Sequence, residues 1–436
     1  TTAVQAVTTE GDTQTKRVED AAAGIVADRE QIGQNKTDIA GLVEGMTDLA
    51  PAIHSTVSDS TIIADDAAEG RPFRGLRVFG KSTQDGTPSV ENPVPIVNAG
   101  EGGSITVEVT GRNLLKPNSH NTYYEFPLKA NTVMTLMTNG KPSQGGNIKF
   151  SATDGSNVWF SIDAGQTRVC RSIGNKDVKG FYDQLKVGGG LEYMFAVGDI
   201  KTYTPYVEPQ SLTLQTPNGL PGVPVSKDGN YTDADGQQWV CDEIDLGRGK
   251  YVQRTAEKEV SEITWSGAGT WGNTDDYKTL AFYAYIDSSN INESWEAVKN
   301  YGICNYATIT SNVFNNSIIG FTLGDYIAFR VPRSLLPDWD ENNPSNEPWI
   351  NWLKAKKEAG NPVIVQYALK TPIERDLTPE EIAAYKALRT YSPTTVITND
   401  AGAGMEVTYV ADTKAYIDKK FKELNQAIVN TQIALL

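Results

Sequence analysis

Two loops of the chain combine tryptophan with acidic and amide side chains, the residue types that suit sugar binding. One is Trp271-Gly-Asn-Thr-Asp-Asp-Tyr277 and the other is Pro337-Asp-Trp-Asp-Glu-Asn-Asn343. An aromatic ring offers a flat apolar face, and the carboxylates and amides around it can hydrogen-bond to hydroxyl groups. The glycan-binding candidates are therefore Trp271, Asp275, Tyr277, Trp339 and Asp340. Alternatively, each tryptophan closes the edge of a β-sheet core, where a large aromatic side chain buries much area.

Residue patterns for catalysis or metal binding are weak. The only histidines, His54 and His120, have no nucleophile motif nearby, so neither a Ser-His-Asp nor a Cys-His centre is predicted. The 54 acidic residues always offer carboxylate pairs for glycoside hydrolysis, but no motif selects one. Residues 231–242 partly match a calcium-binding loop, yet Tyr231 occupies its first ligand position and no helices flank it. A hairpin turn around Asp235-Gly236 is favoured, and we expect no enzyme, no metal and no cofactor.

The composition narrows the class of protein. Only 21% of the 436 residues are charged, while glycine (39) and tyrosine (19) are abundant, which favours turn-rich β structure. A net charge of −15 argues against nucleic acid as a partner. No apolar run is long enough to insert in a membrane, and no signal peptide is visible. Three widely spaced cysteines suggest buried thiols and folding in a reducing cytoplasm. Trp159, in the apolar run 158–160, is predicted to be a core residue.

A seven-residue apolar repeat near the start of the chain predicts a coiled coil. It places five apolar side chains on one seam, and a second heptad seam follows near the end of the chain. The first consists of Val18, Ile25, Ile32, Ile39 and Met46, and the second includes Ile417, Phe421, Leu424 and Ile428. Val4, Val7 and Gly11 extend the first seam backward. We interpret both as oligomerisation helices; the alternative is a single helix packed on a globular domain.

The fold class predicted from these patterns is mainly β with terminal α-helices. Short strand-like runs divided by glycine, asparagine and aspartate turns indicate two antiparallel, jelly-roll-like β-sandwich modules. The predicted order is an N-terminal coiled-coil stem (1–56), a small β linker (57–110), a first sandwich (111–216), a connecting hairpin segment (217–255), a second sandwich with short helices (256–410) and a C-terminal helix (411–436). Asn346 and Thr378 are predicted to begin the short helices.

Several longer phrases of the chain are distinctive as a set. They include Gly80-Lys-Ser-Thr-Gln-Asp-Gly-Thr-Pro88, Glu91-Asn-Pro-Val-Pro95, Val109-Thr-Gly-Arg-Asn-Leu-Leu115, Tyr203-Thr-Pro-Tyr206, Gly219-Leu-Pro-Gly-Val-Pro-Val225, Asn230-Tyr-Thr-Asp-Ala-Asp-Gly-Gln-Gln-Trp239, Leu377-Thr-Pro-Glu-Glu-Ile382 and Thr398-Asn-Asp-Ala-Gly402. Together they resemble tail-fibre and minor structural proteins, including baseplate and receptor-binding proteins, of phages and prophages of Gram-positive bacteria. The resemblance covers residues 76–255 and 362–425, and the stem and residues 256–361 match only in general character.

This resemblance implies a virion tail protein, often a homotrimer, that is assembled in the host cytoplasm. Its partners would be its own copies, other tail or baseplate proteins and a host cell-surface glycan. In related proteins, the module from Asn113 to Tyr206 is similar to a carbohydrate-binding jelly roll. No catalytic residues carry over. Two alternatives stay open: a baseplate spacer without receptor contact, and a polysaccharide depolymerase.

Overall fold

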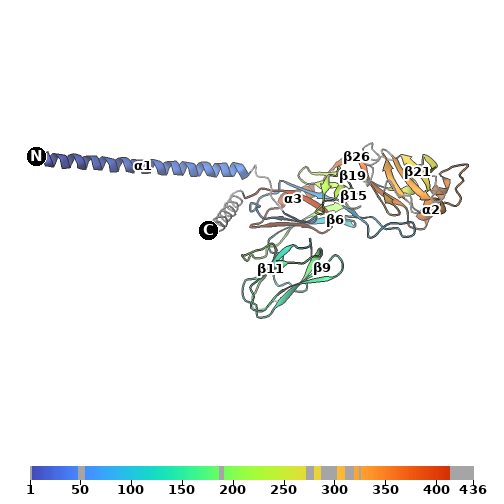
Figure 1. Ribbon diagram of the computed structural model, residues 1–436, viewed down its shortest axis with the longest axis horizontal. Coiled ribbons are helices and arrows are strands. Elements are labelled where there is room, and N and C mark those ends of the chain that lie inside the picture. Colours follow the sequence, from blue (N-terminus) through green and yellow to red (C-terminus); the bar gives the residue numbers. More distant parts are fainter. Residues whose placement is uncertain are drawn as a thin grey trace, which may run out of the picture. The chain divides into compact units, whose positions relative to one another are not determined.

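The computed structural model describes residues 2–47, 55–185, 191–271, 279–285, 302–309, 319–323 and 326–412. Within these ranges the chain is mainly β, and it divides into two compact units, residues 1–52 with 410–436 and residues 53–409. The α-helices and 3-10 helices are α1 (Thr2–Thr47), η1 (Val260–Glu262), η3 (Arg333–Leu335), α2 (Glu347–Glu358) and α3 (Pro379–Ala387). Figure 1 shows the helices and strands along the chain.

Helix α1 is one continuous helix of 46 residues, in agreement with the predicted helical stem (Figure 1). The seam valines Val4, Val7 and Val18 are 71%, 74% and 68% exposed, and Val26, outside the seam, is 56% exposed. The other proposed seam side chains lie outside the described part of the structure: Ile25, Ile32, Ile39, Met46, Ile417, Phe421, Leu424 and Ile428. The helix is therefore confirmed, whereas its assembly into a coiled coil stays a prediction.

Two antiparallel sheets between residues 123 and 197 share one hydrophobic core. The β9 sheet runs β10 (Asn157–Ile162), β9 (Gly146–Ala152), β12 (Val178–Gln184) and β7 (Tyr123–Leu128), and the β8 sheet runs β11 (Arg168–Ser172), β8 (Val133–Thr138) and β13 (Tyr193–Val197). Phe150 and Phe181 from the first sheet pack against Phe195 from the second, with ring centroids 5.8 Å and 5.2 Å apart. Burial of these large rings is what holds the two sheets together.

The strands outside this module pair over long sequence distances. The β6 sheet runs β1 (Ser55–Ser58), β2 (Thr61–Ala64), β27 (Thr395–Asn399), β6 (Gly103–Gly111) and β14 (Gln210–Thr216). The β19 sheet runs β22 (Gly302–Cys304), β26 (Ile364–Asp376), β19 (Lys250–Glu259), β18 (Glu243–Asp245), β3 (Gly75–Phe79) and β28 (Gly404–Thr408). In both sheets, residues from 57–110 pair with strands near the C-terminal end. The segment predicted as a separate β linker is therefore built into shared sheets, because its edges find their hydrogen-bond partners far along the chain.

The β21 sheet and α2 form another core, and two small sheets complete the β structure. The β21 sheet runs β20 (Gly267–Trp271), β21 (Thr279–Tyr285), β25 (Tyr326–Pro332), β24 (Ile319–Leu323) and β23 (Thr308–Ile309). The small sheets are β15 (Gly222–Val225), β17 (Gln238–Cys241) and β16 (Tyr231–Thr232), and β4 (Ser82–Thr83) with β5 (Val97–Asn98). Trp349 of α2 is fully buried and stacks on Phe282, with ring centroids 5.4 Å apart.

The two short helices begin where the sequence predicts, but only one has the predicted cap. At α3, the Thr378 hydroxyl accepts from the Glu381 amide and the Glu381 carboxylate accepts from the Thr378 amide, a complete capping box. At α2, the Asn346 side chain donates instead to the Trp265 carbonyl at 3.2 Å. Asn346 thus ties the helix to the segment that leads into β20 rather than capping it.

Candidate functional site

Among the predicted sugar-binding residues, the structure places Trp339 in the core. Its side chain is 3% exposed, and its ring packs edge-on against Phe282 at 5.5 Å, so it offers no open face to a ligand. This agrees with the alternative that it closes a sheet edge. Asp340 is exposed, and its carboxylate accepts from the Asn342 amide at 2.9 Å. The Trp271 side chain, Asp275 and Tyr277 lie outside the described residues.

A different set of aromatic residues lies on the outer face of the β9 sheet. The cross-strand register pairs Trp159 with Lys149, Lys149 with Tyr182, and Tyr182 with Tyr123. Directly paired residues point to the same side of a sheet, so these four side chains form one row across all four strands. Trp159 is 50% exposed and Tyr123 is 41% exposed. We call Trp159, Tyr182 and Tyr123, with Lys149 among them, the aromatic row.

The alternation of each strand explains this placement and corrects the prediction for Trp159. In β10, Val158 and Phe160 face the core, so Trp159 between them must face the other side of the sheet. The continuous apolar run 158–160 favours a core position only when its polar neighbours, Asn157 and Ser161, are left out. Asn157 and Ser161 lie two residues before and after Trp159 and therefore point to the same face of the sheet. Their polar side chains are the sequence signal for an outward-facing tryptophan.

Contacts within the row hold the tyrosine rings in place. The Tyr123 and Tyr182 rings are 4.8 Å apart, and the Lys149 ammonium lies 5.1 Å from the centre of the Tyr182 ring. A Cβ added at Gly180 would come within 2.6 Å of the Tyr123 hydroxyl, so glycine there allows Tyr123 to lie close to the strand. Burial, followed by the charge of Glu125, raises the pKa of Tyr123 above its ordinary value.

Polar side chains flank the row on the same face of the sheet. The register opposes Ser161 to Asn147 and Asn157 to Ser151, and Gln184 also pairs with Asn147. Amide and hydroxyl groups both donate and accept hydrogen bonds, and they keep these functions without changing charge. The arrangement combines flat apolar surfaces with neutral hydrogen-bonding groups. The aromatic row therefore offers the combination of groups that suits sugar binding. The sequence predicted this combination in the two tryptophan loops rather than on the β9 sheet.

Another groove, with a volume of about 950 Å³, lies along β19 and β26. Its polar side chains largely bind one another: Gln366 Nε2 donates to Asn98 Oδ1 and to Glu257, both at 2.9 Å. The Tyr251 hydroxyl donates to Asp242 at 2.6 Å, and the Arg375 guanidinium covers the Tyr251 ring at 4.1 Å. A ligand would have to replace these existing pairs. The aromatic row, whose rings are open, is the better candidate site.

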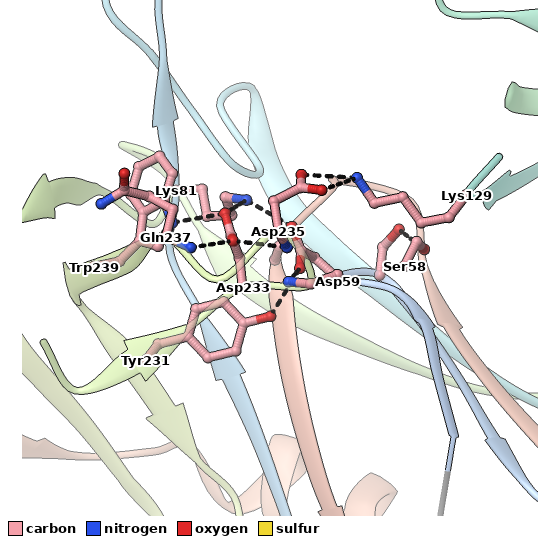
Figure 2. Close-up of polar contacts among 12 residues, drawn as sticks. Ser58, Asp59, Lys81, Lys129, Tyr231, Asp233, Asp235, Gln237 and Trp239 are labelled. Atoms are coloured by element: carbon pink, nitrogen blue, oxygen red, sulfur yellow. Dashed lines mark hydrogen bonds and ion pairs between the residues drawn. The ribbon is translucent and has the colours of Figure 1, made fainter. Parts of the chain in front are cut away.

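The loop that partly matches a calcium site is a hairpin turn, as predicted, and a lysine supplies its positive charge. Figure 2 shows Lys81 between two carboxylates, with its ammonium 2.6 Å from Asp59 and 3.2 Å from Asp233. Burial opposes ionisation of Asp233, but the Trp239 indole and Lys81 together outweigh it and hold its pKa below the usual range. At the tip of the loop, Asp235 accepts from Lys129 at 2.8 Å. This network is structural, since its charges are already paired.

Other chemistry-bearing groups in the described residues point to no reactive centre. Cys241 and Cys304 are buried free thiols, and burial raises the pKa of both, that of Cys304 to about 12. Cys170 is half-buried. Within the described ranges, no three histidine, cysteine or acidic side chains are grouped to hold a metal ion, and no helix has the length and apolar character of a membrane span. Comparison of the chain with protein-family models, with curated proteins and with solved structures found no match.

Proposed function

We propose that this chain is an oligomeric structural protein of a phage tail that binds a host-surface glycan through the aromatic row. The single observation that carries the binding part is the row of aromatic rings across the outer face of the β9 sheet, with Trp159 50% exposed at one end and Tyr123 41% exposed at the other. A patch of neighbouring aromatic side chains on one face of a protein often marks a binding site, whereas single exposed rings are common. The row lies in the module from Asn113 to Tyr206, for which the sequence resemblance implies a carbohydrate-binding jelly roll.

Stacking and hydrogen bonding act together in this proposal. The C–H face of a pyranose ring is apolar and packs against an aromatic face, while its hydroxyls reach the flanking amides. Because paired strands lie about 4.8 Å apart, the row extends across the sheet for roughly 14 Å, which suits an extended chain rather than a single small molecule. The ligand is therefore expected to be a polysaccharide.

The stem supports the oligomeric part of the proposal. The seam positions Val4, Val7 and Val18 leave apolar side chains in water along α1. Packing the seams of three copies together would bury these side chains in a coiled coil. Several weak glycan sites on one assembly would then act at high effective concentration, which raises avidity without a new contact. We propose a homotrimer located in the virion tail.

Adsorption of the full chain to Gram-positive cell walls tests the binding proposal. Trp159→Ala and Tyr182→Ala are each expected to reduce adsorption at least about tenfold, which corresponds to loss of one stacking contact of roughly 1.4 kcal/mol. Tyr283→Ala is the matched control, because Tyr283 is 42% exposed but lies in β21 of another sheet. Adsorption that is unchanged in both row variants would contradict the aromatic row as the site.

The same assay separates the two alternatives. A chain that adsorbs to none of a broad panel of walls, yet assembles with tail proteins, would favour a baseplate spacer. Release of new reducing ends from the wall polysaccharide would favour a depolymerase. Adsorption without release of reducing ends is the result that the proposal expects.

A further inference from the structure

The ammonium group of Lys81 lies against two carboxylates in a site that is mostly closed to water (Figure 2). Its nitrogen is 2.6 Å from Asp59 Oδ2 and 3.2 Å from Asp233 Oδ2. The side chains are 14% exposed for Lys81, 16% for Asp59 and 6% for Asp233. The Trp239 ring borders the ammonium, with its centre 4.7 Å from the nitrogen. A lysine nitrogen and a carboxyl group are thus held in contact with little access to water.

The other oxygen of the Asp59 carboxylate is held by two hydrogen-bond donors. Oδ1 accepts from the Ala234 amide at 2.7 Å and from the Tyr231 hydroxyl at 3.2 Å, and Figure 2 shows the tyrosine hydroxyl directed at this carboxylate. When an amine adds to a carboxyl carbon, negative charge builds up on a carboxyl oxygen, and fixed donors stabilise that charge. The two donors on Oδ1 therefore have the arrangement of an oxyanion hole.

Asp233 approaches the same lysine nitrogen from the hairpin and is itself fixed. Its Oδ2 accepts from the Trp239 indole at 2.9 Å, and its Oδ1 accepts from the amides of Asp235 at 3.0 Å and Gln237 at 2.9 Å. A carboxylate within hydrogen-bond reach of a reacting amine can take up a proton and return it. Asp233 is in position to do this while the Asp59 carboxyl group reacts.

We propose that Lys81 and Asp59 condense in the folded chain to form an isopeptide bond, which is an amide between their two side chains, with Asp233 as the acid–base group. The inference does not depend on the proposed function. The ion pair is the state in which the chain first folds, and the bond forms from it over time. It would join the β1–β2 turn covalently to the segment that follows β3.

The reaction uses only the atoms of these three side chains. A proton moves from Nζ of Lys81 to Oδ2 of Asp59, which leaves a neutral amine and a carboxylic acid. The amine adds to Cγ, so the C–N bond forms and the negative charge on Oδ1 meets the two donors. Asp233 then takes a proton from the nitrogen and gives it to the departing hydroxyl group. The Cγ–Oδ2 bond breaks, one water leaves, and Asp233 ends in its starting state.

Burial and fixed contact favour this reaction over the same reaction in water. Burial disfavours the charged forms of both groups, so proton exchange within the pair costs less than at an exposed site. Fixed contact also removes much of the entropic barrier to bringing an amine and a carboxyl group together. The ion pair of Lys129 with Asp235 provides the contrast, because its atoms are 2.8 Å apart but its side chains are 34% and 70% exposed. We expect no bond there.

The intact mass of the full chain tests the inference. The purified chain is kept folded at neutral pH for several days, denatured and measured by mass spectrometry. We expect the loss of one water and a tryptic peptide that is uncleaved at Lys81 and joined to the peptide containing Asp59. A chain that keeps its full mass would overturn the inference. So would a water loss that maps elsewhere, such as a succinimide at Asp235-Gly236.

Variants identify the part that each side chain plays. Lys81→Arg and Asp59→Ala should abolish the water loss. Asp233→Asn should form the bond at least about tenfold more slowly, because a positioned acid–base group contributes that much or more to a rate. Lys129→Arg is the matched control, and it should leave both the water loss and its rate unchanged.

A second measurement separates the chemistry of the site from the fold. Thermal unfolding shows whether each variant is folded, and wild-type chain that is kept in denaturant for the same time should retain its full mass. Bond formation in denaturant would contradict the folded site as its cause. An unchanged rate in folded Asp233→Asn would remove Asp233 from the reaction.

Discussion

The Lys81 ammonium donates a hydrogen bond of 2.6 Å to the Asp59 carboxylate. Lys81 follows β3 and Asp59 lies in the turn between β1 and β2, so the contact joins the β19 sheet to the β6 sheet. The same ammonium reaches Asp233 at 3.2 Å and lies 4.7 Å from the centre of the Trp239 ring. One lysine therefore fastens two sheets and a hairpin, at a site where all three charged side chains are mostly buried.

Lys81→Met is expected to destabilise the chain by about 2 to 3 kcal/mol, because it leaves two largely buried carboxylates without their cation. The pKa of Asp233 is lowered in the folded state, so its contribution to stability is present above the unfolded pKa, near 4, and is lost as the pH falls through the folded value. The stability difference between wild type and variant should therefore be steady from neutral pH down to about pH 5 and narrow as the pH falls further. Thermal unfolding across this range measures it, and a constant difference would contradict the pairing.

Asp242 should tolerate asparagine but not alanine. Its Oδ1 accepts from the amides of Arg254 and Thr255 and from the Thr255 hydroxyl, and its Oδ2 accepts from Tyr251. An asparagine retains the first three bonds, and its amide can donate to the tyrosine oxygen, so Asp242→Asn is expected to cost under about 1 kcal/mol. Asp242→Ala leaves all four donors unpaired and should cost about 3 kcal/mol. Chemical denaturation at neutral pH compares the two.

The pH dependence of stability gives a second test of Asp242, by comparing wild type with Asp242→Asn. Burial raises the pKa of Asp242 despite its hydrogen bonds. A raised carboxyl pKa gives a stability contribution that is present below the unfolded pKa and is lost as the pH rises through the folded value. Wild type should therefore be most stable relative to Asp242→Asn in acid, and a relative stability that rises with pH would contradict this assignment.

Replacement by alanine should destabilise the protein much more at Trp339 than at Trp159. Trp339→Ala removes a core ring and is expected to cost about 3 to 5 kcal/mol. Trp159→Ala removes a half-exposed ring and should cost under about 1 kcal/mol, because half of its surface is already in water in the folded protein. Denaturant unfolding of the two variants measures both values, and a similar cost for each would mean that Trp159 is a core residue after all.

The seam of α1 can be tested with two valines of similar exposure. Val18→Asp puts a charge at a proposed seam position and should shift the assembly towards the mass of one chain, 47.4 kDa, at micromolar concentration. Val26→Asp places the same charge outside the seam and should leave the mass near that of three chains. Light scattering on the full chain measures both. A wild-type monomer, or equal dissociation in the two variants, would contradict the stem as a coiled coil.

The sequence alone determined the features that depend on neighbouring residues. The capping box at Thr378, the hairpin around Asp235-Gly236 and the long N-terminal helix follow from local hydrogen bonds and periodicity, and the structure contains all three. The mainly β class likewise follows from composition, since turn residues and alternating apolar runs act over a few positions.

Only the tertiary structure decided which strands share a sheet and which aromatic side chains stay in water. Segment 57–110 pairs with strands some 300 residues away, and no local pattern encodes such a partner. Trp339 takes the core position that was one of its two sequence interpretations, whereas Trp159, predicted to be a core residue, is half exposed, because burial depends on what packs against each face. The aromatic row exists only through the register of the four strands that carry it. Long-range packing, which the linear order of residues does not specify, creates the candidate binding surface.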